Sequence, residues 1–407
     1  MPGPLAGIKV IDLSRVLAAP WAAQNLADLG AEVVKVERPR KGDDSRAFGP
    51  PWLKDAQGRD TTESGYFLSA NRGKKSITVD ISQPAGAQIV RELAADADVL
   101  IENYKVDDLK RYGLGYDELA KINPRLIYCS VTGFGQTGPY RSRAGYDFMV
   151  QGMGGLMSIT GERDDRPGGG PQRVGIPLID IITGMYASIA ICAAIAHRAG
   201  SGKGQYIDMA LLDCSVAFLA NQGANYLVTG EAPQRLGNTH PNIVPYESFP
   251  TADGDLILAA GNDNLFRKFC AAAGRPELAD DARFATNSAR VENRAALGQL
   301  IAAAMKQRTT AQWIAELDAA GVPCGPINNI AQVFEDPQVL ARGMRIEVPH
   351  ALGGTAPLVR SPMRFSDTPL EHNIAPPLLG QHTDEILRSR IGRSEQEIAQ
   401  LRESGVI

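Results

Sequence analysis

Apolar residues in the first third of the chain alternate between strand-like runs and helical spacing. Residues 9–13 predict a strand, residues 21–29 a helix that Gly30 ends, and residues 33–37 a second strand. Further elements of the same two kinds are predicted at 76–80, 84–95, 99–101 and 126–130. Strands that alternate with helices in this order predict an α/β fold, a large Rossmann-like domain around a parallel sheet.

The pattern changes after residue 180. An almost uncharged stretch, 181–196, is shorter than the roughly 20 apolar residues of a membrane span and predicts a buried helix. A strand at 205–210 and an apolar helix through Leu227 follow. The next elements, which suit a smaller α+β domain, are a Pro/Gly/Asn-rich loop, a β segment near 255–260 and helices including 294–306 and 311–320.

The C-terminal part is turn-rich, with a strand near 345–348, a Pro-dense segment at 369–377 and a final helix from His382. We expect this part to pack back onto the first domain. The predicted division is therefore a large domain at 1–228, a small domain at 229–325, and a returning segment at 326–407.

Composition narrows the function classes. With 42 Lys+Arg against 46 Asp+Glu the net charge is −4, so neither a nucleic-acid partner nor another polyanion is indicated. Five scattered cysteines and five scattered histidines have no metal-ligand spacing, so we expect no metal site. The N-terminal residues lack a signal-peptide pattern, so the expected location is the cytoplasm, away from membranes.

Candidate ligand-binding motifs follow the predicted strands. A dinucleotide site would need G-x-G-x-x-G after the first strand, where residues 14–20 read SRVLAAP, so hydride transfer is disfavoured. Val36-Glu37-Arg38-Pro39 ends the second strand, and further cations lie at 71–75 and 110–111. Such groups could hold a phosphorylated ligand, although each alone is more often a solvated surface group.

Asp180 is a single carboxylate between apolar flanks at the predicted start of the buried helix. One interpretation is an N-cap that accepts hydrogen bonds from the first-turn N–H groups. The other is a nucleophile, because a partly desolvated carboxylate beside a helix N-terminus can attack an acyl carbon. The two interpretations are compatible, and both stay open.

Nine segments together resemble the class III CoA-transferases, the CaiB/BaiF family, in matching order from about residue 6 to residue 390. They are 14–20, 36–39, 71–76, 102–104, 123–127, 133–139, 144–147, 180–184 and 378–383. Segments at 128–139, 243–246, 260–262 and 321–329 look most like the succinyl-CoA–glutarate (succinate–hydroxymethylglutarate) branch of the family.

The resemblance implies an interlocked homodimer and an activity that moves CoA from an acyl-CoA donor, such as succinyl-CoA, to a dicarboxylate, such as glutarate. The matching nucleophile is Asp180, which would form a mixed anhydride and then an aspartyl-CoA thioester. Tyr146 and Asp147 match the positions that support it. Coenzyme A enters as a thioester substrate, and no permanently bound cofactor is expected.

The resemblance also assigns ligand contacts. The residues matching CoA-binding positions are Val16, Leu17, Ala18, Arg38, Val79, Asn103, Tyr104 and Arg111. A loop that closes over the intermediate in oxalate-specific members matches Gly237, Asn238 and His240. That loop is strongly glycine-rich in those members and is not so here, which argues against formyl-CoA:oxalate transfer.

Two other functions remain as alternatives. An alpha-methylacyl-CoA racemase would carry a His-Asp pair where this chain has Tyr146-Asp147, and a tyrosine with a pKa near 10 is a poor general base at neutral pH. In a non-catalytic CoA-binding protein Asp180 would be only a cap. The distal carboxylate of a dicarboxylate substrate needs a cation, and the candidates are Arg46, Arg72, Arg143, Arg173 and His240.

Overall fold

The computed structural model describes residues 3–407, which divide into two compact units. Unit 1 contains the residues up to Leu156, Val174–Thr229 and Pro337–Ile407, and unit 2 contains Met157–Arg173 and Gly230–Asp336. The sequence placed 157–173 in the large domain. These residues belong to unit 2 because they are tied to it by contacts distant in sequence, such as the Arg235 guanidinium donating to the Ser158 carbonyl at 3.0 Å.

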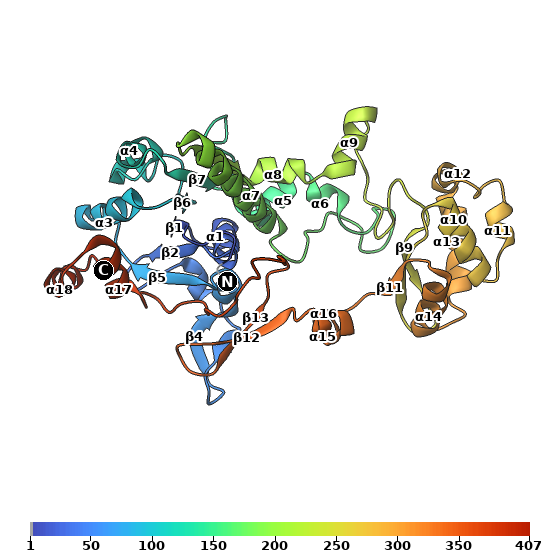
Figure 1. The fold of residues 1–407 in the computed structure, drawn as a ribbon. Coiled ribbons are helices and arrows are strands. Elements are labelled where there is room, and N and C mark those ends of the chain that lie inside the picture. Colours follow the sequence, from blue (N-terminus) through green and yellow to red (C-terminus); the bar gives the residue numbers. More distant parts are fainter. Residues whose placement is uncertain (1–2) are drawn as a thin grey trace. The chain divides into compact units, whose positions relative to one another are not determined.

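A six-stranded parallel sheet forms the centre of unit 1, with strand order β5-β2-β1-β6-β7-β8 (Figure 1). The strands are β1 (Lys9–Asp12), β2 (Glu32–Glu37), β5 (Lys74–Thr78), β6 (Val99–Glu102), β7 (Ile127–Thr132) and β8 (Tyr206–Ala210). Ile11 lies opposite Val34 on one side and Leu100 on the other. The predicted α/β fold with a parallel sheet is confirmed. From β1 the chain adds β2 and β5 on one side of the sheet, and it then adds β6, β7 and β8 on the other side of β1. The strand order therefore reverses between the neighbouring strands β1 and β6, and open α/β sheets bind ligands at such a switch point.

Side chains alternate between the two faces of the sheet, so each face has its own core. Val10, Val33 and Val99 belong to one core, whereas Ile11, Val34 and Leu100 belong to the other. The helices that contribute to the first core are α1 (Ala18–Asp28), α5 (Asp147–Met153), α7 (Leu178–Ser201) and α8 (Leu211–Ala217). The helices that contribute to the second core are α3 (Pro84–Ala95), α4 (Tyr116–Ile122), α17 (Thr383–Ile391) and α18 (Glu395–Glu403).

The C-terminal segment supplies part of the second core, through Ile386, Leu387 and Ile398. The sequence predicted one final helix from His382, and the structure has two. Gly392, at φ 70°, ends α17, and Ser394 caps α18.

The remaining elements of unit 1 are η1 (Asp44–Ala47), β3 (Trp52–Lys54), β4 (Asp60–Ser64), α2 (Gly65–Ser69), η2 (Lys110–Tyr112), α9 (Ala220–Thr229), α16 (Pro337–Ala341), β12 (Arg345–Pro349) and β13 (Thr355–Val359). Helix α6 (Leu156–Ile159) crosses into unit 2.

Helix α7 is only partly the buried helix that the sequence predicted. Its inner face packs on α1 and the sheet through Ile179, Ala187 and Ile191. Its outer face leaves Met185 51% and Ile189 63% exposed. With 24 residues, α7 is long and apolar enough to cross a membrane by length and composition, but the core helix of a soluble protein can pass the same test.

The single apolar helix predicted through Leu227 is two helices, α8 and α9, and the backbone of Ala220 has a left-handed φ of 46° where α9 begins. Helix α9 has no buried residue, and Leu227 and Val228 are more than 80% exposed. Unit 1 therefore presents apolar side chains on both α7 and α9.

Unit 2 combines a three-stranded antiparallel sheet with helices around a separate core that includes Phe266, Leu297 and Trp313. Its elements are β9 (Tyr246–Pro250), β10 (Asp255–Ala259), α10 (Asp263–Ala272), α11 (Glu277–Asp280), α12 (Asn287–Glu292), α13 (Arg294–Met305), α14 (Thr310–Ala320), β11 (Cys324–Pro326) and α15 (Ile330–Glu335).

Candidate active site

A cavity of about 260 Å³ opens at the carboxyl ends of β1, β6 and β7, at the switch point of the sheet. Its walls come entirely from unit 1. They are formed by residues 15–18, Asp44, residues 103–106, residues 131–133, residues 141–146, Asp180 and Leu211. Several loops and the start of α7 thus meet around one space.

The loop after β1 is held against the loop after β6 by a reciprocal hydrogen-bond pair. The backbone N–H of Arg15 donates to Asn103 Oδ1 at 2.9 Å, and Asn103 Nδ2 donates to the Arg15 carbonyl at 2.7 Å. The next residue, Val16, has a φ of 69°. A β-branched residue rarely adopts this left-handed backbone, so surrounding contacts must hold it.

A buried charge cluster of Asp12, Lys35, Asp43 and Lys74 supplies those contacts. All four side chains have 0% exposure. Lys35 Nζ lies 2.8 Å from an Asp43 carboxylate oxygen and donates to the Ser14 carbonyl at 2.8 Å. Asp43 in turn accepts the Val16 backbone N–H at 3.0 Å. The cluster therefore fixes both sides of Arg15.

Pairing sets the protonation of this cluster. Burial by itself would raise the pKa of Asp43, but the Lys35 ammonium and hydrogen bonds from Lys35, Ser45 and Val16 outweigh burial and hold that pKa well below its ordinary value. Burial would likewise lower the pKa of Lys35, and the charges of Asp43, Asp12 and Glu37 raise it instead. Asp43 and Lys35 are thus a stable ion pair at neutral pH.

Asp180 is not the N-cap of α7, so that interpretation of the sequence is wrong. Pro177 occupies the cap position and Asp180 is the third residue of the helix. The cap function belongs to Asp147, whose Oδ1 accepts the backbone N–H groups of Ile179 at 2.8 Å and Asp180 at 3.3 Å. Because this carboxylate comes from more than 30 residues upstream, local spacing could not reveal it. The Asp180 side chain is left free to face the cavity.

Two effects raise the pKa of Asp180 to about 7: its burial and the nearby negative charge of Asp147. No side chain or backbone group among residues 3–407 donates a hydrogen bond that would lower it. An unpaired carboxylate with such a pKa, at the edge of a cavity, is a candidate nucleophile.

Comparison with known proteins identifies the family of the chain. The model of CoA-transferase family III matches residues 5–383. The chain belongs to CoA-transferase family III. It is 51% identical to a succinate–glutarate CoA-transferase of Agrobacterium fabrum over 384 residues, which cover 94% of this chain and 95% of that protein. It is 44% identical to a succinyl-CoA:glutarate CoA-transferase of Homo sapiens over 404 residues, 99% of this chain and 90% of that protein.

A solved structure, a CaiB/BaiF family protein from Brucella suis, has 51% sequence identity and a TM-score of 0.83, and it covers 96% of this chain and 100% of that one. The resemblance derived from sequence motifs is therefore confirmed. The protein is an enzyme that transfers CoA, and its substrates include CoA thioesters.

Half of the fourteen residues that the family resemblance assigned to catalysis, CoA binding or the substrate loop line the cavity. Those lining it are Val16, Leu17, Ala18, Asn103, Tyr104, Tyr146 and Asp180. Arg38 lies just outside and reaches the wall through Asp44, 2.7 Å from its guanidinium. Asp147 is buried behind Asp180 and acts through the start of α7.

The structure does not bring every assigned residue to the cavity wall. Val79 is 1% exposed in the sheet core, and Arg111 pairs with Asp108 at 3.3 Å with its side chain 63% exposed. Gly237, Asn238 and His240 belong to unit 2, where Asn238 Nδ2 donates to Ser248 Oγ at 3.0 Å. Burial and the charge of Arg294 lower the pKa of His240.

Sequence reasoning missed several residues in and around this cavity. Lys35 and Asp43 were not singled out, although a lysine inside the apolar run VVKVE already signals a buried partner. The side chain of Arg15 was given no role, although its guanidinium pairs with Asp44 at 3.0 Å and lies over the Tyr104 ring. Lys105 and Arg141 also line the cavity.

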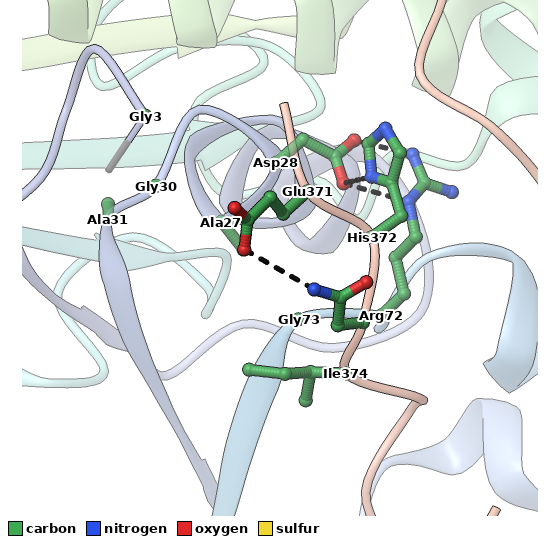
Figure 2. Close-up of a pocket in the computed structure, with 11 residues that line it drawn as sticks. Gly3, Ala27, Asp28, Gly30, Ala31, Arg72, Gly73, Glu371, His372 and Ile374 are labelled. Carbon is green, nitrogen blue, oxygen red and sulfur yellow. Dashed lines mark hydrogen bonds and ion pairs between the residues drawn. The ribbon is translucent and has the colours of Figure 1, made fainter. Parts of the chain in front are cut away.

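A second cavity in unit 1, also of about 260 Å³, contains a different arrangement of charges (Figure 2). The Asp28 carboxylate accepts from Arg72 Nε at 2.8 Å and faces His372 Nδ1 at 3.4 Å. Arg72 Nη1 donates to the Val359 carbonyl at 2.8 Å. Arg72 is therefore committed to contacts within the fold.

Proposed function

We propose that this enzyme moves CoA from succinyl-CoA to a dicarboxylic acid such as glutarate, with Asp180 as the nucleophile. The observation that carries the proposal is the position of Asp180, an unpaired carboxylate facing the switch-point cavity with its pKa raised to about 7. The named activities of the relatives from Agrobacterium fabrum and Homo sapiens support the choice of donor and acceptor.

In the first half of the reaction, an Asp180 carboxylate oxygen attacks the thioester carbonyl of succinyl-CoA. The C–S bond breaks, CoA leaves as a thiolate, and a mixed anhydride joins Asp180 to succinate. The thiolate then attacks the Asp180 carbonyl, succinate leaves, and an aspartyl-CoA thioester remains. A raised pKa helps here, because a more basic carboxylate is a better nucleophile once ionised.

In the second half, the acceptor carboxylate attacks the aspartyl-CoA carbonyl and displaces the thiolate, which gives an anhydride of Asp180 and the acceptor. The thiolate attacks the acceptor's carbonyl and Asp180 leaves as the carboxylate. No net proton transfer is needed, so the site requires no strong general base. Tyr146, which is 71% exposed and lines the cavity, does not need to act as one.

The remaining residues position the reactants in this proposal. Asp147 holds the first turn of α7 and thereby the direction of Asp180. Val16, Leu17, Ala18, Asn103 and Tyr104 form the wall against which CoA would lie, with Arg38 and Arg15 beside it through Asp44. As the family resemblance implies, we also assign Arg111 and the loop bearing Gly237, Asn238 and His240 to substrate binding. Val79, whose side chain is buried in the core, would support the CoA site from behind.

We further propose that the enzyme is a homodimer with interlocked chains. The exposed apolar side chains of α7 and α9, among them Ile189, Leu227 and Val228, support a partner surface, because apolar patches of this kind mark interaction sites. Light scattering should give twice the chain mass of 43.6 kDa, and a monomer at micromolar concentration would contradict the proposal.

Intact-protein mass spectrometry after incubation with succinyl-CoA tests the nucleophile. We expect a covalent adduct that hydroxylamine removes and that peptide mapping assigns to Asp180. The adduct should be absent in Asp180→Ala. The matched control is Asp44→Ala, which removes another carboxylate of the same cavity, one already paired with Arg15 and Arg38. An adduct that persists in Asp180→Ala would overturn the proposal.

A further inference from the structure

The cation that would recognise the far carboxylate of a dicarboxylate can be selected from the side-chain contacts. Arg46 is excluded, because its guanidinium is bound by Glu37 at 2.8 Å, by Glu63 at 3.1 Å and by the Pro377 carbonyl. Arg72 is excluded by its bonds to Asp28 and the Val359 carbonyl. Arg173 already has a partner within the fold. His240 accepts the Asn242 backbone N–H through Nδ1 at 3.1 Å, and burial and the charge of Arg294 lower its pKa, so its ring is neutral at neutral pH.

Arg143 lines the Asp180 cavity. Its guanidinium carbon lies 4.6 Å from the centre of the Tyr140 ring and 5.4 Å from that of Phe134. Within the part of the chain that the structure describes, no carboxylate lies in ion-pair range of this side chain. The two rings support a guanidinium whose hydrogen-bond donors are unused.

The chemistry of this group suits a carboxylate. A guanidinium offers parallel N–H donors that match two carboxylate oxygens, and contact with the Tyr140 and Phe134 rings restrains its position before the ligand arrives. Arg143 also lies on the segment that leads to Asp147, whose carboxylate holds the first turn of the Asp180 helix. Asp180 and Arg143 both line this cavity, so the proposed nucleophile and a cation for the second carboxylate face the same space.

Lys105 is the other cation of the cavity that has no ion-pair partner among residues 3–407. It follows Asn103 and Tyr104 directly at the end of β6, on the side of the cavity where the resemblance places CoA. An ammonium is a point charge that suits phosphate oxygens without the paired geometry of a guanidinium. Comparing a Lys105 variant with an Arg143 variant therefore distinguishes recognition of the CoA phosphates from recognition of the distal carboxylate.

We infer that Arg143 binds the distal carboxylate of the succinyl donor and of the diacid acceptor, and so determines the preference of this enzyme for dicarboxylates. The inference rests on the proposed function, since it assumes that acyl transfer occurs at Asp180.

The test compares the binding of three ligands in an Asp180→Asn background, where acyl transfer is blocked. The ligands are succinyl-CoA, butyryl-CoA, which has the same chain length without the carboxylate, and free CoA. We expect the parent to bind succinyl-CoA about 10- to 100-fold more tightly than butyryl-CoA. Arg143→Gln should reduce this ratio to near one and leave the affinity for free CoA unchanged, and Arg143→Lys should restore part of the ratio.

Two variants serve as controls. Arg141→Gln removes a neighbouring arginine of the same wall that is already paired with Asp107 at 2.6 Å and donates to the Gln136 carbonyl, so the ratio should stay. Lys105→Gln should weaken all three ligands by a similar factor. A thermal melt of each variant establishes that it is folded.

Three outcomes would overturn the inference: a parent ratio near one, an unchanged ratio in Arg143→Gln, or an equal loss for all three ligands in that variant, which would assign Arg143 to CoA phosphate. The covalent adduct at Asp180 is measured separately with the wild-type enzyme. Failure of the proposed function and failure of the Arg143 assignment are therefore distinguishable.

Discussion

Two aspartates at the same edge of the sheet, Asp43 and Asp180, have pKa values that are shifted in opposite directions. The Asp43 side chain has 0% exposure, lies 2.8 Å from the Lys35 ammonium and accepts backbone N–H groups, and its pKa is held below the ordinary range. Asp180 is also largely buried, but the charge that acts on it is the like charge of Asp147, and its pKa rises to about 7. Burial is common to both, and the neighbouring charge decides whether the pKa falls, as for Asp43, or rises, as for Asp180.

The difference assigns separate tasks to the two regions. The paired cluster around Asp43 and Lys35 keeps the Val16 loop in an unfavourable backbone conformation. Asp180, the proposed nucleophile, has no cationic partner among residues 3–407. Breaking the pair or neutralising the unpaired group should therefore have effects of opposite sign on stability.

Asp180→Asn should give the largest effect. We expect transfer activity to fall by at least about 10³-fold, because an amide cannot form the anhydride. The free energy of unfolding at pH 8 should rise, on the order of 2 kcal/mol, because the variant no longer carries an unpaired buried charge. Steady-state kinetics and denaturant unfolding at pH 8 measure the two changes.

The sign of the stability change follows from proton linkage. The folded-state pKa of Asp180, about 7, exceeds the ordinary 3.8, so its contribution to stability is present below pH 4 and is lost as pH rises through 7. Asp180→Asn should remove this decline, so the gain over wild type should be near zero at pH 4. A variant less stable than wild type at pH 8 would contradict this account.

Lys35→Met should have the opposite effect on stability. It leaves Asp43 buried without its ammonium partner, and breaking a buried pair typically costs about 3–5 kcal/mol. The matched control is Lys75→Met on β5, whose partner Glu385 is exposed and whose loss should change stability by about 0.5 kcal/mol or less. Urea unfolding of both variants provides the comparison, and equal effects would show that the Lys35 pair does not stabilise the fold.

The pH dependence of transfer should reveal the coupling of Asp180 to Asp147. In the wild type we expect kcat/KM for the donor to fall below about pH 7, since protonated Asp180 is not a nucleophile. Asp147→Asn removes the like charge that raises this pKa, so the fall should move to lower pH. A pH–rate profile of both proteins measures the shift, and an unchanged midpoint would exclude Asp147 as a cause.

Much of the fold could be predicted from the sequence because its signals are local. The apolar runs gave β1, β2, β6 and β7 within two residues, and Pro84–Ala95 was predicted with its observed bounds. The features that the sequence did not predict depend on features that local periodicity does not show. The placement of 157–173 in unit 2 depends on Arg235, and the second C-terminal helix depends on a break at Gly392 within a short stretch.

For the candidate site, too, local sequence motifs indicated some residues, and long-range contacts decided the others. Family motifs indicated Asp180 and the residues after β1 and β6, and these do line one cavity. Periodicity could not show that Asp147 rather than Asp180 caps α7, because the two residues meet only in three dimensions. Nor could it choose Arg143 among five cations, because that choice depends on which guanidinium groups are already paired.

The smallest expected effect concerns the strain that the Asp43 pair maintains at Val16. Glycine adopts a φ of 69° without the cost of about 1–2 kcal/mol that a side chain incurs there, whereas alanine keeps most of that cost. We therefore expect Val16→Gly to be more stable than Val16→Ala by about 1 kcal/mol, the reverse of the usual order. Denaturant unfolding of the two variants tests this, and a more stable alanine variant would mean that the Val16 loop relaxes freely and that Asp43 does not need to hold it.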